Sequence, residues 1–290
     1  MTEPAASIVV ISHEMARELP RTLLSLSPAY QRCCSPGTCE IIVVDNGSAR
    51  PPAARDFDHL GLDIAVHVFP DPSPSPVAAL NFGLSLARAP LICAWIDGAR
   101  LASPGLVGAS IAAARLHPRP VIASPNYHLG PGRQYVTVRQ GYDQAEEDRL
   151  LASIGWPAEG DRLFEIATPV WHAGELGPML ESNALFLTRA MWDELGGYDP
   201  QFDSPGGGAA NPDVFIRACE LPGVQLVRLK GEATFHQVHG GVSSNASNYA
   251  IDVGKAISRE YFRIRKRPLT PVRDRGWVFD TRSGQLCLDA

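Results

Sequence analysis

Apolar residues along the first 125 positions follow two alternating spacings. Short runs rich in β-branched residues, typical of buried strands, are each followed by a segment whose apolar residues recur at helical spacing. The predicted strands cover residues 7–12, 40–45, 64–69, 91–96 and 121–124. The helical stripes include Met15, Leu19, Leu23 and Leu26, then Val77, Leu80 and Leu84, then Leu106, Val107 and Ile111. Because parallel strands need crossover connections, this order predicts an α/β fold with a mostly parallel, Rossmann-like sheet flanked by helices.

The pattern becomes less regular after Pro125. The second part is predicted to contain helices opening at Asp143 and Asn211, a helix over 188–195, strands over 181–187 and 225–229, and a loop over 233–244. Asn211, followed by Pro212, is the expected N-cap of its helix. A last helix places Val253, Ile257, Tyr261 and Ile264 in register. We predict one domain over residues 1–245, with halves 1–124 and 125–245, and a C-terminal helix and tail over 246–290.

Composition and charge narrow the class of protein. The 290 residues carry a net charge of −5, which argues against a nucleic-acid binder, because such proteins need a basic face. The start lacks a basic region followed by a long apolar one, which predicts a cytoplasmic protein. No apolar run approaches the roughly 20 residues of a membrane helix, so any membrane contact would be peripheral. The six cysteines lack the spacing of a zinc site and are expected to be reduced structural thiols.

Two predicted strands end in an acid. Asp97 and Gly98 follow the apolar run 91–96, and Asp45 closes the run 40–45 before the turn Asn46-Gly47-Ser48. Open α/β sheets bind ligands in the crevice outside the carboxyl ends of their strands. We therefore expect Asp45 and Asp97 to converge on one ligand. No Gly-x-Gly-x-x-Gly follows the first strand, which disfavours a dinucleotide fold of the dehydrogenase type.

Several of these stretches, in this order, resemble family 2 glycosyltransferases of the GT-A fold over most of residues 7–240. They are Ser-Ile-Val-Val-Ile-Ser from residue 7, Glu-Ile-Ile-Val-Val-Asp-Asn-Gly-Ser from residue 40, Ala-Leu-Asn-Phe-Gly-Leu from residue 79, the strand ending at Asp97, and Glu-Leu-Gly-Gly-Tyr-Asp-Pro-Gln-Phe from residue 194. Each motif is weak alone, and their combination is fairly specific.

The resemblance implies transfer of a hexose-type sugar, with inversion, from a nucleotide-diphosphate donor to a hydroxyl of a glycan or glycoside acceptor. The setting would be surface polysaccharide biosynthesis. By this likeness residues 1–124 bind the nucleotide and 125–245 face the acceptor. Asp45 is expected to contact the base, and Asp97 the ribose or a metal. Ser12, Glu14 and Asn81 match donor-binding positions.

Two departures from the family pattern concern the metal and the base. The Asp-x-Asp motif reads Asp97-Gly98-Ala99, so a methyl group replaces the usual metal-binding acid. Asn211 occupies the usual position of the catalytic base, and Asp213 is the nearest carboxylate. An inverting transfer needs a carboxylate to accept the acceptor proton. Asp213 is the candidate base and Glu181 the alternative, while a first-turn acid favoured by the helix dipole needs no catalytic role.

Two hypotheses address the diphosphate leaving group. In the first, Asp97 and His236 hold Mg²⁺ or Mn²⁺, with His239 as a weaker candidate. In the second, arginines replace the metal through bidentate phosphate contacts. The candidate arginines are Arg100, Arg273 and Arg275.

Other features leave alternatives open. Four aromatic residues either stack on an acceptor sugar or pack in the core: Tyr127, Tyr135, Trp156 and Trp171. The basic run 259–266 is read as a solvated helix face, with acceptor or anionic-surface contact as the alternative. A catalytically degenerate GT-A domain that binds nucleotide or glycan without turnover is the competing function. Nucleotidyl transfer is disfavoured, because residues 12–18 lack a glycine-rich, lysine-containing phosphate cradle.

Overall fold

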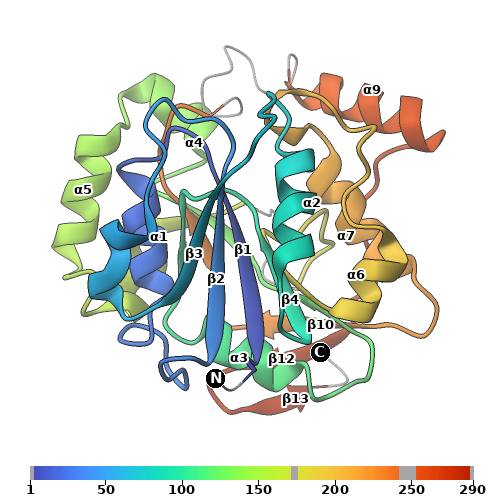
Figure 1. Ribbon diagram of the computed structural model, residues 1–290, viewed down its shortest axis with the longest axis horizontal. Helices are drawn as coiled ribbons and strands as arrows, with labels where there is room; N and C mark the ends of the chain where they lie inside the picture. The colour runs from blue at the N-terminus through green and yellow to red at the C-terminus, as the bar shows by residue number, and fades with distance from the viewer. Residues whose placement is uncertain (1–2, 171–175, 242–252, 288–290) are drawn as a thin grey trace.

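A nine-stranded sheet forms the centre of the computed structural model, which describes residues 3–170, 176–241 and 253–287 (Figure 1). The strand order is β13-β12-β10-β6-β9-β4-β1-β2-β3. The bounds are β1 Ala6–Ser12, β2 Cys39–Asp45, β3 Asp63–Val68, β4 Leu91–Trp95, β6 Pro120–Ala123, β9 Ala184–Thr188, β10 Gln225–Lys230, β12 Trp277–Asp280 and β13 Gln285–Cys287. Strands β3, β2, β1 and β4 are parallel, and β9 runs antiparallel to β4 and β6. The predicted α/β fold is confirmed.

Strand β1 shows why the first part of the chain could be predicted. All seven of its residues are buried. Val9 and Ile11 pack into one core cluster, while Ile8 and Val10 pack into the other, on the opposite face of the sheet. A strand covered on both faces reads as a continuous apolar run.

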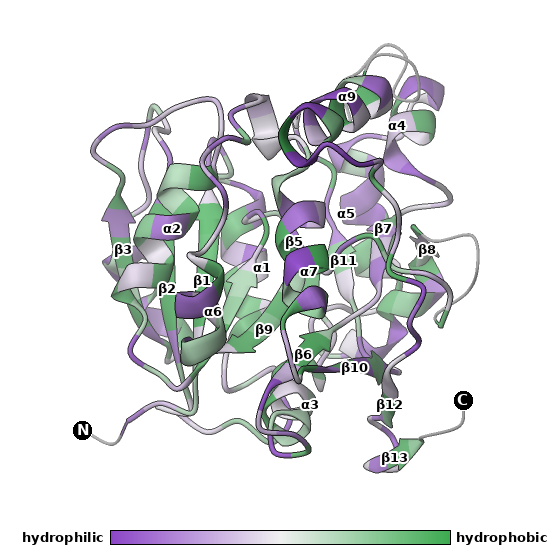
Figure 2. Ribbon diagram, turned by 90° about the vertical axis from the view of Figure 1, so that its right-hand side faces the viewer, coloured by the Kyte–Doolittle hydropathy of each residue, from purple (hydrophilic) through white to green (hydrophobic). Residues whose placement is uncertain are grey.

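Helices pack against both faces of the main sheet. The bounds of the helices are α1 Glu18–Leu26, α2 Val77–Leu86, α3 Leu106–Ala113, α4 Gln134–Thr137, α5 Gln144–Ser153, α6 Arg189–Leu195, α7 Ala210–Glu220 and α9 Gly254–Arg265. The apolar stripe of α1 packs with α3 in one cluster, and the stripe of α2 packs with α6, α7 and α9 in the other. The main strands are coloured mostly as hydrophobic in Figure 2, and the helices α5, α7 and α9 show hydrophilic residues on their surfaces. Short 3₁₀ turns cover Ala54–Leu60, Val138–Gln140, Gly160–Ile166 and Pro205–Gly207.

A second sheet of four short strands was not predicted. Its order is β5-β11-β7-β8, with bounds β5 Arg100–Ala102, β11 Thr234–His236, β7 Asn126–Leu129 and β8 Ala167–Pro169. The expectation of a loop over 233–244 is therefore wrong for Thr234–His236. Three or four residues are too few to show an alternating pattern, and these strands form through pairing between distant segments.

The start of α7 also differs from the prediction. The helix begins at Ala210 with Ala209 as its N-cap, so Asn211 lies inside the first turn. The Glu260 carboxylate, on α9, accepts a hydrogen bond from the Ala209 N–H at 3.2 Å. A side chain 51 residues away thus supplies the cap, and the Asn211 amide is used elsewhere.

The C-terminal part contributes more than the predicted helix. Strand β12 pairs in parallel with β10, and β13 pairs antiparallel with β12, so the tail extends the main sheet. Within the described residues no helix has the length and apolar character needed to cross a membrane. All six cysteines are free, as expected.

Candidate functional site

The carboxyl ends of three neighbouring strands bring several predicted residues to one edge of the sheet. Ser12 and Asp45 are opposite each other in the pairing of β1 with β2, and β4, on the other side of β1, leads into Asp97. This edge lies at the top of Figure 1. These residues come from the ends of adjacent strands.

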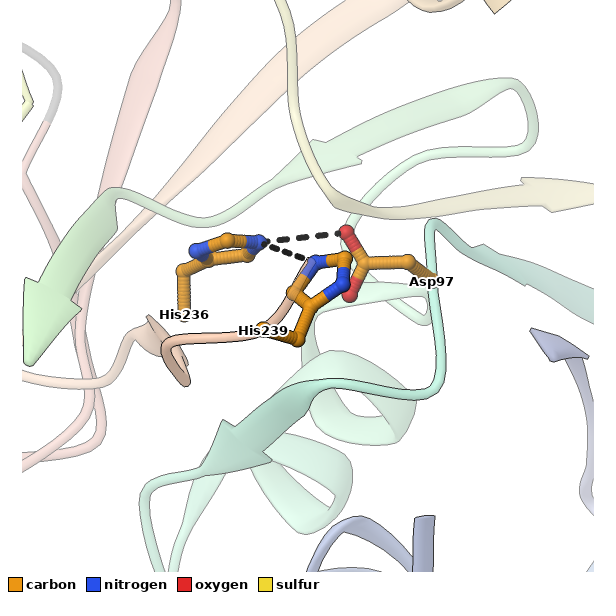
Figure 3. A group of neighbouring side chains, drawn as sticks. All are labelled: Asp97, His236 and His239. Carbon is orange, nitrogen blue, oxygen red and sulfur yellow. Dashed lines mark hydrogen bonds and ion pairs between the residues drawn. The ribbon is translucent and has the colours of Figure 1, made fainter. Parts of the chain in front are cut away.

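Asp97, His236 and His239 form a compact cluster (Figure 3). The His236 Nε2 atom lies 3.5 Å from Asp97 Oδ2 and 3.2 Å from His239 Nε2. One ligand atom from each of the three residues lies within 4.8 Å of the others. His239, the weaker candidate in the sequence, is therefore part of the same group as His236.

Local backbone structure sets the direction of the Asp97 carboxylate. Asp97 has a left-handed conformation with φ of 63°. Aspartate tolerates this region better than most residues because its side chain bonds locally, and here the Ala99 N–H donates to Oδ1 at 3.0 Å. Gly98 packs against Leu19 and Met15, so a side chain at this position would be crowded.

Strand pairing in the second sheet brings His236 to Asp97. Arg100, the first residue of β5, is opposite His236 of β11. The Gln134 side chain bonds both the Nδ1 atom and the backbone carbonyl of His236. With Nδ1 occupied, the Nε2 atom faces Asp97. Gln134 was not foreseen, because a glutamine at the start of a short helix gives no sequence signal of this role.

Arg100 shapes the electrostatics of the cluster. Burial alone would raise the pKa of Asp97, but the Arg100 guanidinium, with Nε 3.4 Å away, and His236 hold it well below its usual range. Burial and Arg100 together lower the pKa of His236 to about 4. A charged carboxylate therefore faces a neutral imidazole at neutral pH. Arg100 itself is held by the Ile96 carbonyl and the Asn126 side chain.

The donor set fits a divalent transition metal. One carboxylate and two imidazoles suit Mn²⁺ or similar ions, whereas Mg²⁺ prefers oxygen ligands. Two nitrogen atoms 3.2 Å apart are at a spacing that two ligands of one ion adopt, since metal–nitrogen bonds are about 2.0–2.1 Å. Ala99 is fully buried in the apolar cluster under α1 and offers no ligand. Ala99 leaves the motif without its second acid, and the two histidines are the other potential metal ligands beside Asp97.

The segment between the two histidines is fixed by groups that the sequence did not single out. The Val238 N–H donates to the buried Glu147 carboxylate at 2.6 Å, and Glu147 also pairs with Arg17 at 3.2 Å. The Gln237 N–H donates to the Ala99 carbonyl at 2.7 Å. These contacts tie the residues after β11 to α5 and to Ala99, directly before β5. Glu147 looks like an ordinary helix acid in the sequence, so nothing there indicates this contact.

Asp45 and Glu14 are connected through one turn. The Asp45 carboxylate is buried and accepts from the Ser48 hydroxyl at 2.6 Å and the Ser48 N–H at 2.9 Å. The Glu14 N–H donates to the Ser48 hydroxyl at 2.7 Å, and the Glu14 carboxylate accepts from the Ala49 N–H at 2.6 Å. The structure thus brings Ser12, Glu14 and Asp45 together. Their roles in donor binding stay predictions.

Asn81 has a clear structural partner. Its amide nitrogen donates to the Tyr198 carbonyl, and its amide oxygen accepts from the Tyr198 N–H, both at 2.8 Å. Gly197, at φ of 71°, leaves no room for a Cβ against this amide. The contact ties α2 to the Gly-Gly-Tyr-Asp segment. A donor-binding role for Asn81 stays a prediction.

The two candidate bases have different surroundings. Asp213 is fully buried, and its oxygens are bound by Arg217 at 2.7 Å and Arg265 at 2.5 and 2.7 Å. Glu181 is half-buried and accepts from the Asn211 amide at 2.8 Å. The same amide lies 3.1 Å from the Asn183 side-chain oxygen.

Glu181 is also connected to the end of β4. The Asn183 carbonyl accepts from the Ile96 N–H at 2.9 Å, directly before Asp97. The group of Glu181, Asn183 and Asn211 therefore adjoins the strand that delivers the Asp97 carboxylate.

The remaining candidates lie apart from the cluster or in packing contacts. Arg273 and Arg275 are exposed on the segment between α9 and β12. Tyr127 packs against Phe164 and Phe235, and Trp156 lies near Tyr30. The Tyr135 hydroxyl accepts from Arg133 at 3.2 Å. Trp171 lies outside the described residues. Acceptor stacking by these aromatics stays a prediction.

Comparisons with known proteins agree with this architecture. The family model described as Glycosyl transferase family 2 matches residues 7–164, more than half of the chain. A search of curated proteins finds no match. Solved structures of similar fold include Staphylococcus aureus TarS 1-349, with TM-score 0.55 and 13% identity over 89% of this chain and 65% of that chain. The TarS 1-349 complex with UDP-GlcNAc has TM-score 0.51 and 12% identity over 89% of this chain and 66% of that chain.

A third structure is the mannosyltransferase PcManGT from Pyrobaculum calidifontis in complex with GDP-Man and Mn²⁺. It has TM-score 0.56 and 14% identity over 93% of this chain and 67% of that chain. This chain spans about two thirds of the length of these structures, and the likeness to them is one of fold. The family match, together with this shared architecture, establishes that the chain belongs to glycosyl transferase family 2 and has the GT-A fold.

Proposed function

We propose that this protein transfers a sugar, with inversion, from a nucleotide-diphosphate donor to a hydroxyl of a glycan or glycoside in surface polysaccharide biosynthesis. The observation that carries the proposal is the Asp97, His236 and His239 cluster beside the strand ends that deliver Ser12 and Asp45. A nucleotide diphosphate needs both a partner for its base or ribose and a positive group for its phosphates. This edge of the sheet supplies residues suited to each.

Asp97, His236 and His239 are proposed to hold Mn²⁺ or Mg²⁺. When bound, the ion supplies positive charge that stabilises the departing diphosphate. The donor set favours a transition metal over Mg²⁺, and the solved complex of PcManGT with GDP-Man and Mn²⁺ supports Mn²⁺ as that ion. Arg100 holds Asp97 in its charged form, which is the form that binds a cation.

Glu181 is proposed as the base, with Asp213 as the alternative. The acceptor oxygen attacks the anomeric carbon while the bond to the diphosphate oxygen breaks with its electron pair. The acceptor proton passes to a carboxylate oxygen. Glu181 uses one oxygen for the Asn211 amide, whereas both oxygens of Asp213 bind guanidinium groups. Asn211, at the usual base position, then orients Glu181.

Release of nucleoside diphosphate tests the proposal. The full chain is incubated with a panel of uridine and guanosine diphosphate sugars, with Mn²⁺ and with excess chelator, in the presence and absence of oligosaccharide acceptors. We expect release with one donor class, restored after chelation by added Mn²⁺. Thermal shift with the same panel measures binding separately, because ligand stabilisation scales with affinity.

The outcomes separate the alternatives. Donor binding without release would contradict the proposal and indicate a degenerate binding domain. Full activity in chelator would assign the diphosphate to arginines such as Arg100. Glu181→Gln is expected to lower kcat by about 10²–10⁴-fold, the usual contribution of a general base, with donor affinity unchanged. Glu165→Gln, at an exposed site, is the matched control.

A further inference from the structure

Helix α9 has one face that is firmly attached to the body of the protein. Tyr261 is buried in the core cluster shared with α7, and the Glu260 carboxylate accepts from the N–H groups of Ser204 and Ala209. Arg265 pairs with Asp199 at 2.7 Å and with Asp213 at 2.5 Å. These contacts fix the rotation of the helix and thereby decide which side chains point outward.

The outward face carries cations around an aromatic ring. The exposed residues of this stripe are Lys255, Arg259, Phe262, Arg263 and Lys266. Spacings of four, three and four residues from Lys255 to Lys266 place them along one side of a helix. Phe262 is 55% exposed, and only two other large apolar side chains in the described residues are comparably exposed.

The charge of this stripe is not balanced by neighbours. Among the described residues, the four cations make no ion pair, whereas Arg265 and Arg267 at the end of the same helix are both paired. The only acid of α9, Glu260, points inward. An unneutralised basic stripe on a chain with a net charge of −5 is a local positive surface. A solvated face explains the cations but not the exposed phenyl ring between them.

We propose that the outer face of α9 docks on an anionic lipid surface. Lys and Arg side chains near a membrane attract acidic headgroups, and an aromatic ring on the same helix face inserts at the boundary of headgroups and acyl chains. Single-stranded nucleic acid could contact both the cations and the ring, but the net charge of −5 argues against a nucleic-acid binder. Figure 1 shows α9 at the same end of the molecule as the carboxyl ends of the strands, so docking would turn the candidate site toward the membrane.

Sedimentation with vesicles tests this docking and does not depend on any transferase activity. The full chain is mixed with vesicles of phosphatidylcholine alone or with added phosphatidylglycerol. We expect binding only to the anionic vesicles, weakening as salt rises. Arg259→Glu with Arg263→Glu is expected to lower the partition coefficient at least about tenfold, and Phe262→Ala about tenfold, with rescue by Phe262→Trp.

Controls separate specific docking from general charge attraction. Arg55→Glu with Arg115→Glu makes the same change in net charge at exposed positions elsewhere and should leave the partition coefficient within about twofold. Circular dichroism confirms that each variant is folded. Absence of vesicle binding by the unmodified chain, or an equal loss in the control variant, would overturn the proposal. The proposal would also be overturned if the protein bound a DNA oligonucleotide and not vesicles, and if Phe262→Ala left that DNA binding unchanged.

Discussion

Asp97 and Asp213 are both candidate site acids in the sequence, yet their surroundings in the structure differ. The Asp97 side chain is 22% exposed and faces Arg100 at 3.4 Å and His236 at 3.5 Å, with His239 in the same group. Asp213 is fully buried and is bound by two guanidinium groups at 2.5–2.7 Å. The first carboxylate keeps capacity for a further cation, whereas the charge of the second is already balanced. Whether an acid can bind a metal or accept a proton thus depends on how far its charge is already paired, which its sequence position does not show.

Between these two acids, the larger expected effect on kcat comes from removing the charge at Asp97. Asp97→Asn should lower kcat by about 10²–10³-fold, the range found when one stabilising group is lost from a charged transition state. It should also weaken Mn²⁺ binding, because an amide is a poor ligand for a divalent ion. Isothermal titration with Mn²⁺ and diphosphate release under saturating donor measure the two effects.

Normal Mn²⁺ affinity in Asp97→Asn would remove Asp97 from the proposed metal set. His67→Gln, on the edge strand β3 and away from the cluster, controls for loss of a generic surface metal ligand. Its Mn²⁺ affinity and kcat should match the unmodified protein.

Asp213→Asn should act on stability instead. The substitution leaves Arg217 and Arg265 with less negative charge in a buried position, and breaking a buried ion pair on one side costs about 3–5 kcal/mol. Urea denaturation measures this loss of unfolding free energy, while diphosphate release at a temperature where the variant is folded measures kcat. Unchanged stability with a collapse of kcat would instead make Asp213 the base.

Sequence reasoning reached the strand-end acids but not their partners. Asp97 and Asp45 were predictable because parallel strands align their carboxyl ends at one edge. His236 was found by its residue type, but its position beside Asp97 depends on β5 and β11, two three-residue strands whose paired residues lie 132 to 136 positions apart in the sequence. The cap of α7 by Glu260 comes from α9. Such contacts follow from three-dimensional packing and leave no local pattern.

Glu147 is a further buried acid, and its negative charge is only partly offset by Arg17. Burial raises its pKa to about 7, although the Val238 N–H and Arg17 oppose the shift. Arg21 and the Tyr142 hydroxyl also face it, and Asp148 shares Arg17 and Arg21. In the unfolded chain its pKa is near 4.5. The folded state therefore keeps a proton between these values that the unfolded state has released.

The raised pKa of Glu147 makes the folded state less stable as pH rises. As pH rises from about 4.5 to 7, Glu147 should lower the free energy of unfolding by at most about 3 kcal/mol, since each pKa unit corresponds to about 1.4 kcal/mol. Glu147→Gln stays neutral, can still accept from Val238 N–H, and should flatten this part of the profile. Denaturation of the metal-free protein at several pH values measures the difference. Parallel profiles for the two proteins would mean that Arg17 balances Glu147 as completely as Arg217 and Arg265 balance Asp213.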